Sequence, residues 1–209
     1  MSTEIYGCIE IRHPHADDDW YDDEPWLYAM DLSPLYLGND YAALACLFGV
    51  RNYAGWEPVA PDRGLPTDVS AQVRGDFEHW SALDAALHGA TWVTWRELEA
   101  VDMDGVPPGA HGRLRVQDSA VPALIREYWV RDDWPAGIVD RFGELPFGST
   151  PATARPGTWT ADGAHLDFHR VTREDVIGPG SGWEHVFAVM KAMAGRFGPD
   201  GVRLVAYFD

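Results

Sequence analysis

The chain has 209 residues, of which 46% are hydrophobic and 12% aromatic, a composition that excludes an intrinsically disordered protein. Its 16 basic and 33 acidic side chains give a formal net charge of −17. Such a charge repels phosphate backbones and anionic lipid surfaces, so we expect no direct binding to nucleic acid or to a membrane. The acidic excess lies mainly in residues 1–104, which carry 20 acidic and 5 basic side chains, whereas residues 105–209 are near-neutral.

The sequence favours a cytoplasmic protein. No run of about 18 apolar residues occurs, and Met1–Glu4 lacks the basic and apolar parts of a signal peptide. Cys8 and Cys46 each lie in an apolar segment, which favours buried thiols in a reducing compartment over a disulfide framework. The length fits one buried core, so we expect a single domain over residues 1–209.

The first elements form a predicted hairpin. Apolar residues favour a strand over residues 3–12 and a second over residues 26–32. Between them, residues 13–25 combine six acids with aromatic side chains and show no periodicity, which indicates a loop.

Two helices are predicted next, separated by an irregular connection. Asp40 is expected to cap a short helix that ends at Val50, and Asp68 is expected to cap a helix that extends through Phe77. The intervening residues 51–66 are rich in Gly and Pro, which is typical of a connection without regular structure.

The middle of the chain contains a well-marked helix start. Thr94 and Glu97 form a capping box ahead of a short helix over residues 95–101. Leu114 and Val116 indicate a brief strand. A helix is then predicted from apolar residues that fall on one helical face, namely Val121, Leu124, Ile125, Tyr128 and Trp129.

The last third has the clearest pattern. Asp162-Gly163 predicts a hairpin between residues 158–160 and 165–171. Apolar residues at three- and four-residue steps predict a helix over 183–197, followed by a strand over 202–208. Together these elements predict an α+β fold. We expect a mixed or mainly antiparallel sheet with the N- and C-terminal strands in its core and helices packed on it.

Five strings in this sequence carry a resemblance to a known family: Glu4–Glu10, Asn39–Asn52, Arg63–Ser70, His88–Thr94 with Glu97-Leu98, and Val202–Asp209. The most specific is Arg-Gly-Leu-Pro-x-Asp-Val-Ser at residues 63–70. With these strings the chain resembles an uncharacterised family encoded by bacteriophages and actinobacteria, whose last strand ends in Tyr/Trp-Phe-Asp. The resemblance implies no known activity. Members of that family often begin with Asp-Ile-His, and this chain has Glu4 and Tyr6 at the corresponding positions.

One cluster in the predicted hairpin has the residue types of a metal site. Alternation along a strand places His165, Asp167 and His169 on one face. Two imidazoles and one carboxylate are a known ligand set for a divalent metal. An amphipathic hairpin with its polar face in water shows the same alternation. Because same-face residues on a strand lie about 7 Å apart, the solvated face is the favoured interpretation.

Other histidines precede the helix that starts at Thr94. His79, Asp84 and His88 would complete the metal site, although their spacing matches no standard metal motif. The Gly-rich segment 178–182 precedes the longest helix and has the geometry for an anion, but it lacks the fingerprint of a nucleotide-binding loop, so a flexible connection is favoured.

Four further residues are candidates for ligand binding. Arg63 and Asp68 are either a binding pair or residues that tie down the long connection. Trp20 and Trp26 lie among acids, and such residues either form a cage for a cation or fill a core.

These observations support three hypotheses for function. The leading one is a binding protein whose acidic, aromatic first half contacts a basic protein or a cationic ligand, in phage–host interaction or defence. The second is a metal-dependent hydrolase that uses His165, Asp167 and His169 with a divalent metal. The third is a phage accessory or structural protein without catalysis.

Overall fold

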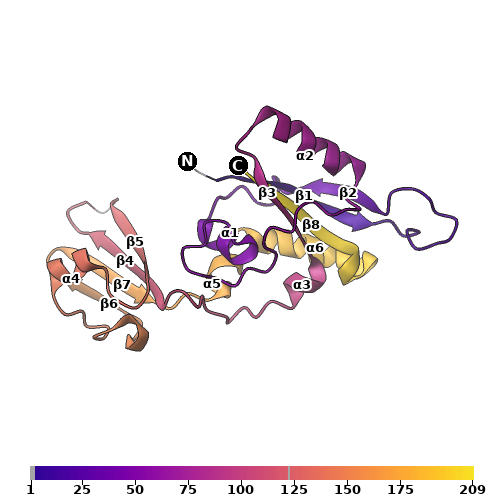
Figure 1. Ribbon diagram of the computed structural model, residues 1–209. Helices are drawn as coiled ribbons and strands as arrows, with labels where there is room; N and C mark the ends of the chain where they lie inside the picture. Colours follow the sequence, from indigo (N-terminus) through magenta and orange to yellow (C-terminus); the bar gives the residue numbers. More distant parts are fainter. Residues whose placement is uncertain (1–2, 122) are drawn as a thin grey trace.

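The computed structural model describes residues 3–121 and 123–209. Within these residues the predicted α+β class is confirmed, and the strands form two four-stranded antiparallel sheets instead of one (Figure 1). Sheet A has the order β2-β1-β8-β3, and sheet B has the order β5-β4-β7-β6. Sheet A consists of β1 (Ile5–Arg12), β2 (Trp26–Asp31), β3 (His88–Thr94) and β8 (Val202–Phe208). Sheet B consists of β4 (Gly112–Asp118), β5 (Ile125–Val130), β6 (Gly157–Ala161) and β7 (Ala164–His169).

Helices cover both faces of sheet A. The helix α2 lies over one face, whereas α1, α3, α5 and α6 lie on the other (Figure 1). The helices are α1 (Tyr41–Phe48), α2 (Ala71–Leu83), α3 (Trp95–Glu99), α4 (Ala136–Phe142), α5 (Arg173–Ile177) and α6 (Trp183–Phe197). Two short 3₁₀ turns are η1 (Pro151–Thr153) and η2 (Pro199–Gly201).

The strands β1 and β8 form the middle of sheet A, as predicted for the two ends of the chain. Ile9 and Leu204 face the main core, which α1 and α6 complete. Cys8 and Val205 point to the opposite face, where they pack against Val73 of α2. Because successive residues of a strand alternate between faces, both sides of these strands are apolar.

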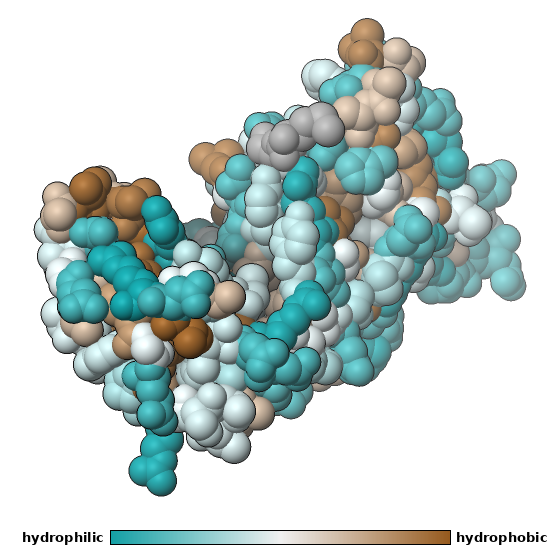
Figure 2. Space-filling model, turned by 60° about the vertical axis from the view of Figure 1, so that its left-hand side comes forward, coloured by the Kyte–Doolittle hydropathy of each residue, from teal (hydrophilic) through white to brown (hydrophobic). Residues whose placement is uncertain are grey.

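Sheet B forms a second lobe with its own core. Leu114, Leu166 and Phe168 pack with residues of α4 and of the following turn. Hydrophilic side chains cover most of the face shown in Figure 2, where this lobe comes forward. Among the described residues, no helix combines the length and apolar character needed to cross a membrane.

The start of α1 is as predicted, but the start of α2 is not. Asp40 caps α1 by accepting a hydrogen bond from Ala42 N at 2.8 Å, and the helix ends at Phe48 with Gly49 as its left-handed cap. Ser70, not Asp68, is the N-cap of α2. The prediction was wrong because the carboxylate of Asp68 is engaged by Arg203 instead.

The capping box of Thr94 and Glu97 is confirmed at α3, whereas the helix predicted after it is wrong. The segment from Ile125 to Val130 is the strand β5, which pairs with β4. Residue 122 lies outside the described residues. Tyr128 packs on the core of sheet B and Trp129 on the main core, so these apolar residues serve two faces of a strand instead of one face of a helix.

The predictions for the last third are confirmed. The hairpin β6–β7 turns at Asp162 and Gly163, with φ of 45° and 69°. Such positive φ values at both central residues match the twist of the flanking strands. The helix α6 and the strand β8 follow within the predicted ranges.

Candidate ligand-binding cleft

The acidic and aromatic residues of the first half do form a cage, and the cage holds a cation of the chain itself. The guanidinium carbon of Arg203, on β8, lies 3.8 Å from the ring centroid of Trp26 and 5.9 Å from that of Trp92. Arg203 Nε donates to Glu10 Oε2 and Arg203 Nη1 to Asp68 Oδ1, each at 2.8 Å. Trp26 Nε1 donates to Asp68 Oδ2, also at 2.8 Å.

Glu10 and Arg203 are buried, whereas the side chain of Asp68 is 45% exposed, and both carboxylates are paired with the guanidinium. The relative exposure is 0% for Glu10 and 2% for Arg203. Burial alone would raise the pKa of Asp68, but the hydrogen bonds and charge of Arg203 outweigh it and hold that pKa below its ordinary value. Trp26 and Asp68, both candidates for external ligand binding, are therefore committed to internal contacts.

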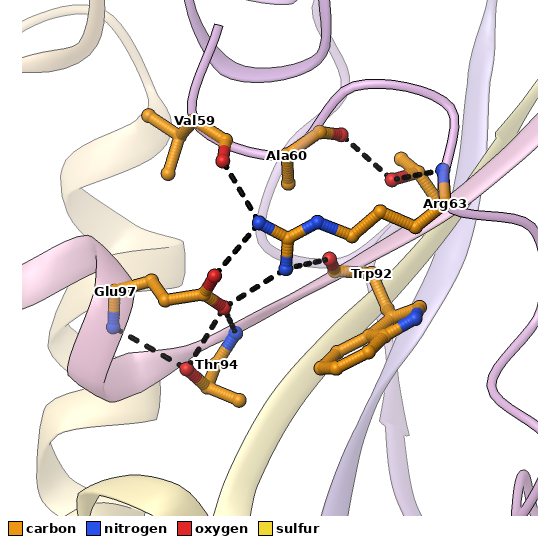
Figure 3. Close-up of polar contacts among 7 residues, drawn as sticks. Val59, Ala60, Arg63, Trp92, Thr94 and Glu97 are labelled. Carbon is orange, nitrogen blue, oxygen red and sulfur yellow. Dashed lines mark hydrogen bonds and ion pairs between the residues drawn. The ribbon is translucent and has the colours of Figure 1, made fainter.

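Arg63 is also committed internally (Figure 3). Its guanidinium donates two hydrogen bonds to the carboxylate of Glu97, at 2.7 and 3.1 Å, and others to the carbonyl oxygens of Val59 and Trp92. The same carboxylate accepts from Thr94 in the capping box. Arg63 and Asp68 thus hold the connection that precedes α2 against sheet A. Of the two roles that the sequence allowed for them, this is the role of tying down the long connection.

Trp20 lies at the tip of the β1–β2 hairpin and is 67% exposed. Its ring contacts His15, while His13 stacks on Tyr21 with ring centroids 4.3 Å apart. The loop 13–25 is folded by its own turns and by the ion pair of Arg12 with Asp17. The contact of this tip with a basic protein stays a prediction.

The three residues proposed on β7 for a metal site share one face of that strand. The alternation along β7 is confirmed, because Leu166 and Phe168 are buried and His165, Asp167 and His169 lie on the other face. His165 Nδ1 is 3.1 Å from Thr160 Oγ1, and His169 Nδ1 is 3.7 Å from Asp167 Oδ2.

The residues expected to complete that metal site do not lie on sheet B. His79 and Asp84 lie at α2 and its C-terminal cap, and His88 lies on β3. Across residues 3–121 and 123–209, no group of three or more His, Cys, Asp or Glu side chains has the geometry to hold a metal ion.

The Gly-rich segment before α6 supplies its own anion. Glu184 Oε2 accepts a hydrogen bond from Gly182 N at 2.6 Å. Backbone N–H groups at this helix start lower the pKa of Glu184. A carboxylate of the chain therefore occupies the place where the sequence allowed an external phosphate.

The two cysteines are buried thiols, as predicted. Burial is the largest cause of the raised pKa of both groups, and the pKa of Cys46 rises to about 11. Neither has the lowered pKa that activates a cysteine nucleophile.

An open cleft of about 950 Å³ lies at the edge of sheet A where β8 ends and β1 and β3 begin. Phe208 pairs with both Ile5 and His88 at this edge. The cleft is lined by Thr3, Phe48, Gly49, Val50, Arg51, Asp62, Ala86, His88, Gly89, Phe208 and Asp209. Its volume falls within the range usual for small-molecule sites, about 300 to 1,000 Å³.

Local backbone features shape this cleft. The ladder between β3 and β8 is interrupted between His88 and Thr91, and Gly89 in this bulge has a φ of 64°. Bulges redirect the neighbouring side chains. Arg51 and Asp62, on the segments that face the bulge, have φ values of 50° and 37°. Positive φ is uncommon for residues other than Gly, and such strain gathers at functional sites.

Three of the charged or polar residues around the cleft are held by neighbouring groups. Arg51 Nε donates to Thr3 Oγ1 at 2.7 Å, and the guanidinium lies 5.0 Å from the ring centroid of Tyr41. The carboxylate of Asp209 accepts from Glu4 N at 2.6 Å and lies 3.2 Å from the hydroxyl of Tyr6. Burial and the charges of Asp209 and Glu4 raise the pKa of Tyr6 to about 12.

His88 has one ring nitrogen committed. Its Nδ1 lies 2.8 Å from the carbonyl oxygen of Ala86. A carbonyl oxygen only accepts, so Nδ1 carries a proton, and in the neutral tautomer Nε2 is a hydrogen-bond acceptor. Within the described part of the chain, neither His88 Nε2 nor the carboxylate of Asp62 has a hydrogen-bond or ion-pair partner.

Sequence reasoning named His88, for a different purpose, and missed Arg51, Asp62 and Asp209. Three of these four residues lie in the strings that carry the family resemblance, namely 39–52, 88–94 and 202–209. The strings therefore contained three of the four residues. That these residues lie around one cleft could not be predicted, because it depends on the strand order of sheet A. Comparison with models of known protein families, with curated proteins and with solved structures gave no match.

Proposed function

We propose that this chain is a cytoplasmic binding protein and that the cleft at the end of β8 is where it binds a small molecule. The observation that carries this proposal is the pair of oppositely charged residues, Arg51 and Asp62, held with left-handed backbone beside the same cleft. Strained charged residues at a concave site are maintained at a cost in stability, which a binding role explains.

The lining of the cleft supports binding of a small molecule. Apolar side chains from two segments line it, namely Phe48 and Val50 at and just after the end of α1, and Phe208 on β8. A few polar groups lie around them. An apolar base with a small number of placed polar groups is the usual character of ligand sites, in which the polar groups fix orientation.

The proposal is tested by filling the cleft. Ala86 is exposed at the rim, and Ala86→Trp places an indole there without removing a polar group. A library of small molecules is screened by thermal unfolding, because a ligand that binds only the folded chain raises the melting temperature. Any compound that stabilises the native chain is expected to lose its effect in Ala86→Trp.

A matched control is the neighbouring residue Ala85, which is exposed and does not line the cleft. Ala85→Trp adds the same indole and is expected to keep the ligand response. Equal responses in the two variants would place binding elsewhere and would refute the proposal.

A further inference from the structure

Some polar side chains of the cleft have hydrogen-bond partners within the chain, and others are available to a ligand. Arg51, the only guanidinium among the residues that line the described cleft, is engaged by Thr3 and stacked against Tyr41. The side chain of Asp209 is engaged by the N–H of Glu4 and by Tyr6. These contacts hold the walls of the cleft together.

The two groups without partners among the described residues are both hydrogen-bond acceptors. Asp62 presents a carboxylate, and His88 presents Nε2 in the neutral tautomer whose Nδ1–H donates to the carbonyl oxygen of Ala86. A ligand that satisfies both groups must bring donors. A carboxylate or phosphate would instead place its own acceptors against them.

Charge around the cleft favours the same kind of ligand. The carboxylates of Asp62 and Asp209 line it against the single guanidinium of Arg51, and Glu4 adds a third carboxylate beside Asp209. The net charge of −17 on the whole chain also attracts cations and repels anions.

We infer that the cleft selects a protonated amine with an apolar body. This inference rests on the proposed function and names its ligand class. The ammonium donates to the carboxylate of Asp62 and to Nε2 of His88, and the apolar body lies against Phe48, Val50 and Phe208. A charge-assisted hydrogen bond between ammonium and carboxylate is stronger than a bond between neutral groups.

The test compares three probes that share one ring and differ in the head group: benzylamine, benzyl alcohol and benzoate. Each is titrated into the native chain and followed by NMR chemical shifts. Fragments of this size bind weakly, so a Kd on the order of 1 mM is expected for benzylamine. Benzyl alcohol is expected to bind about fivefold more weakly, because its head group is neutral, and benzoate is expected to be the weakest.

The role of Asp62 is tested with Asp62→Asn, which removes the charge and keeps a residue that tolerates left-handed backbone. This variant is expected to bind benzylamine about fivefold more weakly and benzyl alcohol nearly as well as the native chain. The control is Asp162→Asn, in the β6–β7 turn, where the backbone has a φ of 45° and the residue does not line the cleft. It is expected to leave all three affinities unchanged.

The outcomes separate the ligand class from the site. Benzoate binding more tightly than benzylamine, with that binding lost in Ala86→Trp, would overturn the ligand class and leave the cleft as the site. Benzylamine binding that persists in Ala86→Trp would overturn both. An equal loss of benzylamine affinity in Asp62→Asn and Asp162→Asn, or no binding of benzylamine at all, would also overturn the inference.

Discussion

The cage around Arg203 and the cleft at the end of β8 both combine carboxylates with apolar or aromatic side chains, and they differ in whether the carboxylates have internal partners. In the cage around Arg203, Glu10 and Asp68 both bind the guanidinium, and two tryptophan rings lie near it. In the cleft at the end of β8, Asp62 has no partner within the described residues and lies on an exposed loop. Residue types alone do not distinguish these two places.

The difference shows how partners decide the role of a charge. A buried ion must be paired, because desolvation without compensation costs several kcal/mol per charge. The cage meets this requirement with its own arginine and so fixes the fold. An exposed carboxylate keeps its water and is available to a ligand, so the cleft is the better candidate for binding.

Breaking the cage is expected to have the largest effect. Arg203→Leu leaves Glu10 buried without its cation, and removal of one partner of a buried ion pair costs about 3 to 5 kcal/mol. The free energy of unfolding is measured by urea denaturation. A loss below about 1 kcal/mol would mean that Glu10 takes up a proton at little cost and that the cage does not depend on its charges.

The matched control removes both charges. The double variant Arg203→Leu with Glu10→Leu is expected to recover part of the lost stability, because replacing a whole buried ion pair by apolar residues is often nearly neutral. A double variant less stable than Arg203→Leu alone would contradict this account.

Much of the fold could be predicted from the sequence, because local signals were strong at particular residues. The capping box at Thr94, the Asp162-Gly163 turn and the apolar stripe of α6 all specify their elements within a few residues. The segment 125–130 was misassigned because its apolar residues fit a helical face. Pairing with the preceding strand β4 decided the outcome.

The candidate site was harder to predict because it is made by tertiary contacts. The sequence showed acids and tryptophans together but not that Arg203, more than 100 residues away from most of them, would occupy the cage. Likewise Arg51, Asp62 and Asp209 become neighbours only because β8 lies between β1 and β3.

Acid is expected to weaken the cage through Asp68. Its pKa is lower in the folded chain than its ordinary value, so Asp68 contributes stability above that ordinary value, about 4, and the contribution is lost as the pH falls through the lower, folded pKa. Asp68→Asn lacks this contribution. Because the Asp68 side chain is 45% exposed and solvent screens its charge, the variant is expected to lose about 1 kcal/mol or less near neutral pH, and less still as the pH falls below about 4.

This expectation is checked by urea denaturation of both proteins over a pH series. The difference in the free energy of unfolding should shrink toward acid pH. A difference that grows toward acid pH would show that protonated Asp68 contributes more than its ionised form and would contradict the direction of the pKa shift.

The smallest effect on stability is expected at the cleft, where the carboxylate of Asp62 has no internal role. Asp62→Asn should change the free energy of unfolding by less than about 0.5 kcal/mol, because the site is exposed and Asn tolerates positive φ. Asp62→Val should cost about 1 to 2 kcal/mol, because a β-branched side chain clashes in left-handed backbone. Urea denaturation of the two variants separates the backbone from the charge. Equal losses in both would give the Asp62 carboxylate a structural role like that of Asp68, and the cleft would then lack its available acceptor.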